Sequence, residues 1–72
     1  MLDNMKKMLY DLYINYYESE EGTAKEQRAD GAILAIKRLL RAEYGREKAN
    51  EIIKEQSKNA KYVVFGDENF QL

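Results

Sequence analysis

The chain has 72 residues, and its 12 Lys and Arg against 13 Asp and Glu give a formal net charge of −1. This length allows one small domain, and the balanced charge excludes the strongly basic field typical of nucleic-acid-binding domains. The absence of Cys and His removes disulfides, thiolate metal sites and the commonest general base at neutral pH.

The first segment has apolar residues at three- and four-residue spacing, which predicts a helix from about residue 2 to residue 19. A second stripe at i, i+4, i+7 spacing lies on another side of the same helix and consists of Tyr10, Ile14 and Tyr17. Tyr is common both in the partly exposed wall of a small core and in protein interfaces. The second stripe is therefore either the edge of the core or a candidate interface.

The second helix is predicted over about residues 24–44. Gly22 ends the preceding helix, Thr23 is a good N-cap, and Glu26 completes a capping-box pattern. We expect one continuous helix, with Gly31 allowing a close helix crossing, and its 31–44 stretch carries an apolar arc of roughly 200° at 100° per residue. This arc predicts a central helix that the other two cover, although Leu34 lies on its polar side.

Gly45 is the expected C′ residue of the second helix, and a third helix follows over about residues 46–59. Its apolar stripe is narrow and predicts a helix at the edge of the fold. The stripe consists of Ala49, Ile52, Ile53, Gln56 and Ala60.

The last residues change in character. Residues 62–65 have high β propensity, and a turn-like stretch from Gly66 to Asn69 follows them. The sequence thus predicts an all-α, three-helix domain over residues 1–60 with an extended C-terminal arm or short β segment over residues 61–72. The alternative is an α+β fold with a short hairpin or a strand pair between subunits.

No catalytic pattern stands out among the carboxylates, which are interleaved with Lys and Arg as solubility requires. General acid–base catalysis needs a desolvated pocket, so we expect no enzyme, and no metal, cofactor or small-molecule substrate. No apolar run approaches the roughly 20 residues that span a bilayer, and no signal peptide pattern opens the chain, so we expect a cytoplasmic protein without membrane contact.

The expected function is that of a non-catalytic protein–protein interaction or regulatory module, forming a homodimer or binding a protein partner. A small domain with leftover apolar residues gains stability by association. In size and in Lys, Tyr and Asn usage the chain resembles small reading frames of bacterial genomes and prophages, a likeness of composition alone. The candidate interface residues are Tyr10, Ile14, Tyr17, Leu34, Tyr62, Val64, Phe65 and Phe70.

The alternative function is a small DNA-binding regulator, because two helices joined at a Gly loosely resemble a helix-turn-helix unit. Several acidic residues in the third helix would meet the phosphates and weigh against it. The side chains able to contact nucleic acid in this alternative are Arg38, Arg41, Arg46, Lys48 and Asn50.

Overall fold

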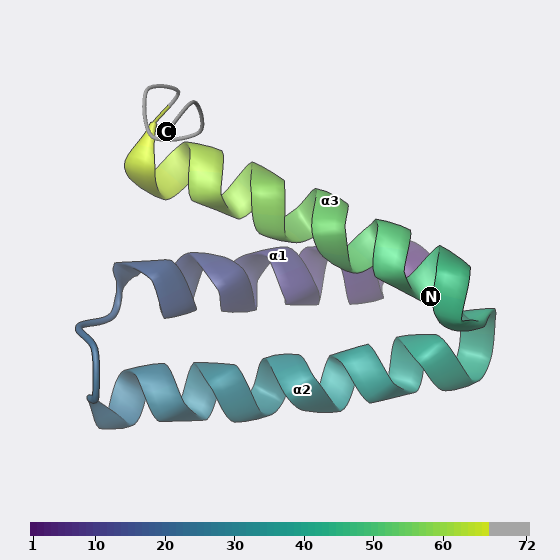
Figure 1. Cartoon of the computed structure of the whole chain (residues 1–72), viewed down its shortest axis with the longest axis horizontal. Coiled ribbons are helices and arrows are strands. Elements are labelled where there is room, and N and C mark those ends of the chain that lie inside the picture. The colour runs from purple at the N-terminus through teal and green to yellow at the C-terminus, as the bar shows by residue number, and fades with distance from the viewer. Residues whose placement is uncertain (67–72) are drawn as a thin grey trace.

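Three helices joined by two short connections make up the computed structural model, which describes residues 1–66 (Figure 1). The helices are α1 (Leu2–Glu18), α2 (Ala24–Tyr44) and α3 (Arg46–Phe65). α1 and α2 run antiparallel, and α3 crosses α1 obliquely on its way back from the α2–α3 turn (Figure 1). No strand occurs within residues 1–66, which confirms the all-α class.

The capping box predicted at the start of α2 forms, although α1 ends at Glu18 with Ser19 as its C-cap and not at Gly22. Thr23 caps α2, and its hydroxyl accepts a hydrogen bond from the Glu26 amide at 3.3 Å. The Glu26 carboxylate reaches back to the amide of Gly22 at 3.0 Å, so two amides at the helix start are satisfied. α2 then continues through Gly31 without a break, as expected.

Gly45 alone joins α2 to α3, since it is both the C-cap of α2 and the N-cap of α3. Its φ of 84° and ψ of 161° belong to a region that is essentially restricted to glycine. This one residue therefore sets the direction in which α3 leaves α2.

The core lies between all three helices and contains the apolar stripes that the sequence predicts. Among residues 1–66, Leu9 and Leu40 are the largest side chains that are completely buried. The buried apolar residues are Met5, Leu9, Tyr13, Ala29, Ile33, Leu40, Ala49, Ile52 and Ala60.

The prediction that α2 is the central helix and α3 an edge helix is wrong. α1 has the most extensive packing, and its contact with α3 exceeds its contact with α2. Ala49 and Ala60 are small and fully buried, so α3 packs closely against its neighbours. The apolar arc of α2 is only partly covered, because Leu39 stays half exposed. Gly31 also makes no close helix crossing within residues 1–66, since a Cβ built there meets none of their atoms within 4 Å.

The prediction of an extended or β segment at residues 62–65 is also wrong. α3 continues past Asn59 to Phe65, and the amide of Gly66 closes its last turn on the Tyr62 carbonyl at 2.8 Å. No Pro or Gly interrupts residues 46–65, and burial of Ala60 anchors the final turns, so tertiary packing overrides the β propensity. The expected boundary between residues 60 and 61 therefore falls inside α3. The rest of the expected arm, from Asp67 onward, lies outside the described residues.

Candidate interaction surface

An open groove of about 450 Å³ separates α1 from α2 on the surface. It is lined almost entirely by apolar atoms, although the charged residue Asp11 is also part of the lining. The other residues that line it are Met8 and Leu12 of α1, and Ala32, Ala35 and Ile36 of α2.

The groove exists because α2 places short side chains beside α1. Ala32 and Ala35 are too small to fill the space beside Leu12, which itself packs against the edge of the core. Met8 is 55% exposed on the α1 side. Leu39 is 50% exposed and lies one helical turn beyond Ala35 on the same side of α2. Together these residues form a continuous apolar surface, called here the α1/α2 face.

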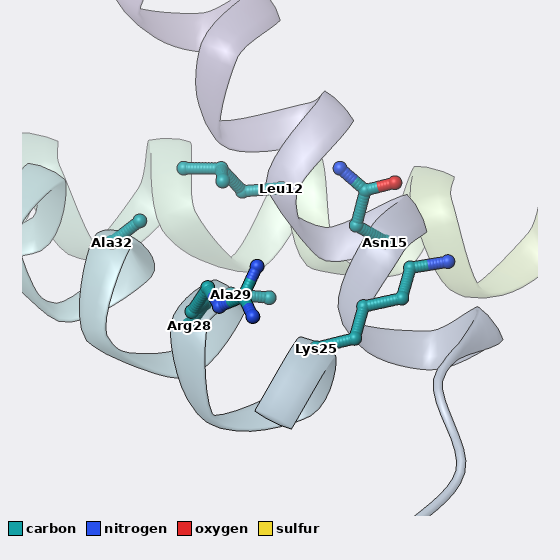
Figure 2. Close-up of a pocket in the computed structure, with 6 residues that line it drawn as sticks. All are labelled: Leu12, Asn15, Lys25, Arg28, Ala29 and Ala32. Atoms are coloured by element: carbon teal, nitrogen blue, oxygen red, sulfur yellow. The ribbon is translucent and has the colours of Figure 1, made fainter. Parts of the chain in front are cut away.

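A second hollow of about 340 Å³ extends the groove towards the start of α2 (Figure 2). Leu12 and Ala32 line both hollows. Figure 2 shows Lys25 extending from the first turn of α2 towards Asn15 of α1. With Arg28 also lining this hollow, the groove has an apolar middle and a cationic end.

The predicted second stripe of α1 packs within the domain. Tyr10, Ile14 and Tyr17 are partly buried against the core. The Tyr17 ring stacks on that of Tyr13, with ring centroids 5.7 Å apart. Burial raises the pKa of the Tyr13 hydroxyl, and the nearby Tyr17 hydroxyl acts in the same direction. These contacts explain the apolar character of the stripe without a partner.

Tyr17 joins α1 to α3 through three contacts. Its hydroxyl and that of Ser57 are hydrogen-bonded at 2.6 Å, and its ring lies 5.7 Å from the ring of Phe65. The ammonium group of Lys61 lies 5.6 Å from the same ring, within the range of a cation–π contact. Tyr17 therefore helps to hold the C-terminal turns of α3 on the domain.

Removing the Tyr17 hydroxyl with Tyr17→Phe should lower the free energy of unfolding by about 0.5–1.5 kcal/mol, the usual net value of one hydrogen bond. Ser57→Ala should have a similar effect, and the double variant should lose less than the sum of the two. Urea unfolding followed by circular dichroism measures all three. Tyr10→Phe, at a half-buried Tyr of the same helix, is the matched control and should change little. Full additivity of Tyr17→Phe and Ser57→Ala would show that the hydrogen bond does not couple the two helices.

The remaining predicted interface residues do not form one surface with the α1/α2 groove. Leu34 is 47% exposed on α2 but lies outside the residues that line the groove. Tyr62 and Phe65 are exposed in the last turns of α3, and Val64 is half-buried there. Phe70 lies outside the described residues.

The residues of the alternative nucleic-acid prediction are all exposed around the α2–α3 turn and the adjoining helices. Arg41 donates from Nε and Nη2 to Oδ1 of Asn50 at 3.4 Å, so these two side chains are engaged with each other. The Lys48 ammonium lies 5.5 Å from the Tyr44 ring. Arg38 and Arg46 are exposed as well.

The α1/α2 face contains residues that the sequence did not single out. The three- and four-residue spacing predicts Leu39 in the core-facing stripe of the second helix, with Ala35 at its margin, and Met8 beside the core-facing stripe of the first. Their exposure depends on where α3 packs, which helical periodicity does not reveal. One available signal is the apolar arc of α2, because an arc of roughly 200° leaves apolar side chains exposed wherever the neighbouring helices do not cover all of it.

No group of three or more acidic side chains among residues 1–66 is placed to hold a metal ion. None of the helices in this part of the chain is both long enough and apolar enough to cross a membrane.

The chain matches no family model, and no significant match is found among curated proteins or solved structures.

Proposed function

We propose that the protein is a non-catalytic interaction module that acts as a homodimer and uses the α1/α2 face as its contact surface. The observation that carries this proposal is the open apolar groove between Met8 and Ile36, together with the half-exposed side chain of Leu39 beside it. Connected apolar surface of this kind is typical of protein interaction sites.

A second copy suits this face because the face carries charges of both signs. Asp11 of α1 lines the groove, whereas Arg28 of α2 lines its extension. A surface with both signs can complement itself across a two-fold axis. A domain of 72 residues buries only about 60% of the surface of its unfolded chain, so covering more apolar surface stabilises it.

The test is the oligomeric state, measured by sedimentation equilibrium over a range of micromolar concentrations. The wild type should form a reversible dimer, and Leu39→Glu should raise the dissociation constant by about tenfold or more, which corresponds to about 1.4 kcal/mol or more. The reason is that a carboxylate in the apolar contact would lose its hydration.

Leu34→Glu is the matched control, because Leu34 is about as exposed on the same helix but lies outside the groove lining. It should leave the dissociation constant unchanged. A monomeric wild type throughout this range would refute the proposal. Dissociation by Leu34→Glu but not by Leu39→Glu would also refute it, because the contact would then lie on the other side of α2.

A further inference from the structure

Two charged residues of α2 each lie at the end of the helix where the helix dipole has the same sign as their own charge. Lys25 is in the first turn, at the positive end of the helix dipole, and Glu43 is in the last turn, at the negative end. Within residues 1–66 neither side chain has a hydrogen bond or an ion pair. Neither helix stability nor pairing with another of residues 1–66 therefore explains these two charges.

Lys25 and Glu43 point to the same side of α2. They are 18 positions apart, which is about five turns at 3.6 residues per turn. The α2 residues of the α1/α2 face lie between them. From the N-terminal to the C-terminal end, this side of α2 therefore has a basic residue, then apolar residues, then an acidic residue. The apolar residues in question are Ala32, Ala35, Ile36 and Leu39.

We propose that two copies pair through the α1/α2 face with their α2 helices antiparallel about a two-fold axis, so that Lys25 of each copy meets Glu43 of the other. This inference rests on the proposed homodimer and specifies its geometry. The midpoint between the two charges is position 34, so Ala32 of one copy lies opposite Ile36 of the other, and Ala35 lies near the axis. A small residue facing a large one, with Ala35 at the centre, lets the helices approach closely.

The opposite orientation is disfavoured by the same charges. With α2 helices parallel, Lys25 would face Lys25 and Glu43 would face Glu43 at the two ends of the contact, and like charges across an interface are repulsive. The antiparallel arrangement also brings Arg28, one turn after Lys25, towards the acidic end of the second copy. Charge complementarity thus selects one orientation for a face whose apolar part alone would accept several.

Charge reversal tests this orientation. Lys25→Glu and Glu43→Lys should each raise the dimer dissociation constant by about tenfold or more, because each dimer contains the contact twice. The double variant should return to within about threefold of the wild type, because the charges are exchanged and the pairing is kept. Both single variants suit the helix dipole better than the wild type, so the monomers should melt no lower and loss of the dimer cannot be due to unfolding. Lys54→Glu, an exposed reversal on α3, is the control that should leave the dimer unchanged.

Disulfide trapping gives an independent measurement, because the chain contains no Cys. Residues 25 and 43 of one helix are about 27 Å apart at 1.5 Å per residue, far beyond the reach of a disulfide. Under mild oxidation, Lys25→Cys alone and Glu43→Cys alone should stay uncrosslinked, whereas an equimolar mixture should form a covalent heterodimer.

The outcomes separate this inference from the proposed function. A covalent homodimer of Lys25→Cys alone would show parallel helices and overturn the inference. If the mixture does not crosslink and the double reversal does not restore the dimer, while Leu39→Glu still dissociates it, the α1/α2 face is the interface in another geometry. In that case only the inference fails. A monomeric wild type overturns both.

Discussion

Replacing Leu40 by Ala is expected to lower the free energy of unfolding by about 2–5 kcal/mol, the usual cost of deleting a large aliphatic side chain from a core. Leu40 is 0% exposed and lies among the residues that α1, α2 and α3 contribute to the core. At roughly 0.05–0.15 kcal/mol per residue, a chain of this length has a total stability of about 4–11 kcal/mol. The substitution should therefore unfold a large part of the population at moderate temperature.

The neighbouring residue provides a matched control. Leu39→Ala makes the same chemical change one position along the same helix, where the side chain is 50% exposed. It should change monomer stability by less than about 1 kcal/mol, because much of the side chain is already in water. Urea unfolding at low protein concentration compares the two variants. Equal destabilisation by both would mean that the boundary between the core and the α1/α2 face is misplaced.

The sequence was sufficient to predict the three helices and the connections between them. The signals at these points are local: Thr23 and Glu26 satisfy amides of the next helix, and Gly45 adopts a backbone conformation that other residues avoid. The alternating three- and four-residue spacing also identified most of the buried residues, because a helix turns by a fixed angle per residue.

The end of α3 was not predictable from the same kind of signal. Residues 62–65 have strong β propensity, but this preference depends on a neighbouring strand that the fold does not supply in the described residues. Burial of Ala60 and the contact between Phe65 and Tyr17 favour another helical turn instead. The burial of Ala60 and the Phe65–Tyr17 contact both depend on segments that are distant in the sequence.

The candidate interface was only partly predictable for a related reason. Periodicity showed that α1 has apolar residues on two sides, but not which side would meet α3. The structure packs Tyr10, Ile14 and Tyr17 within the domain and leaves Met8 exposed. Which apolar side of a helix stays uncovered follows from the packing of a third element, so the α1/α2 face appears only in three dimensions.

Replacing Gly45 by Ala should lower the free energy of unfolding by about 1–3 kcal/mol. At a φ of 84° and a ψ of 161°, a Cβ strains the backbone even though it would meet no atom of residues 1–66 within 4 Å. A connection of one residue offers no neighbour to absorb the change, so relief of the strain would have to move α3 and disturb Ala49, which is completely buried.

Gly31→Ala makes the identical substitution inside α2 and should have the opposite sign. Gly31 lies in the helix and has no positive φ, and no atom in the described part of the chain occupies the space of its Cβ. Ala should therefore raise the free energy of unfolding by roughly 1 kcal/mol through helix propensity. Thermal unfolding should then place Gly45→Ala below the wild type and Gly31→Ala above it at equal protein concentration. Wild-type stability in Gly45→Ala would contradict the assigned role of the α2–α3 turn, because it would mean that α3 can leave α2 along a path open to any residue. The same Gly→Ala change would then lower the free energy of unfolding at one site and raise it at the other. That result would show that the backbone conformation of each glycine, and not the added methyl group itself, decides the effect.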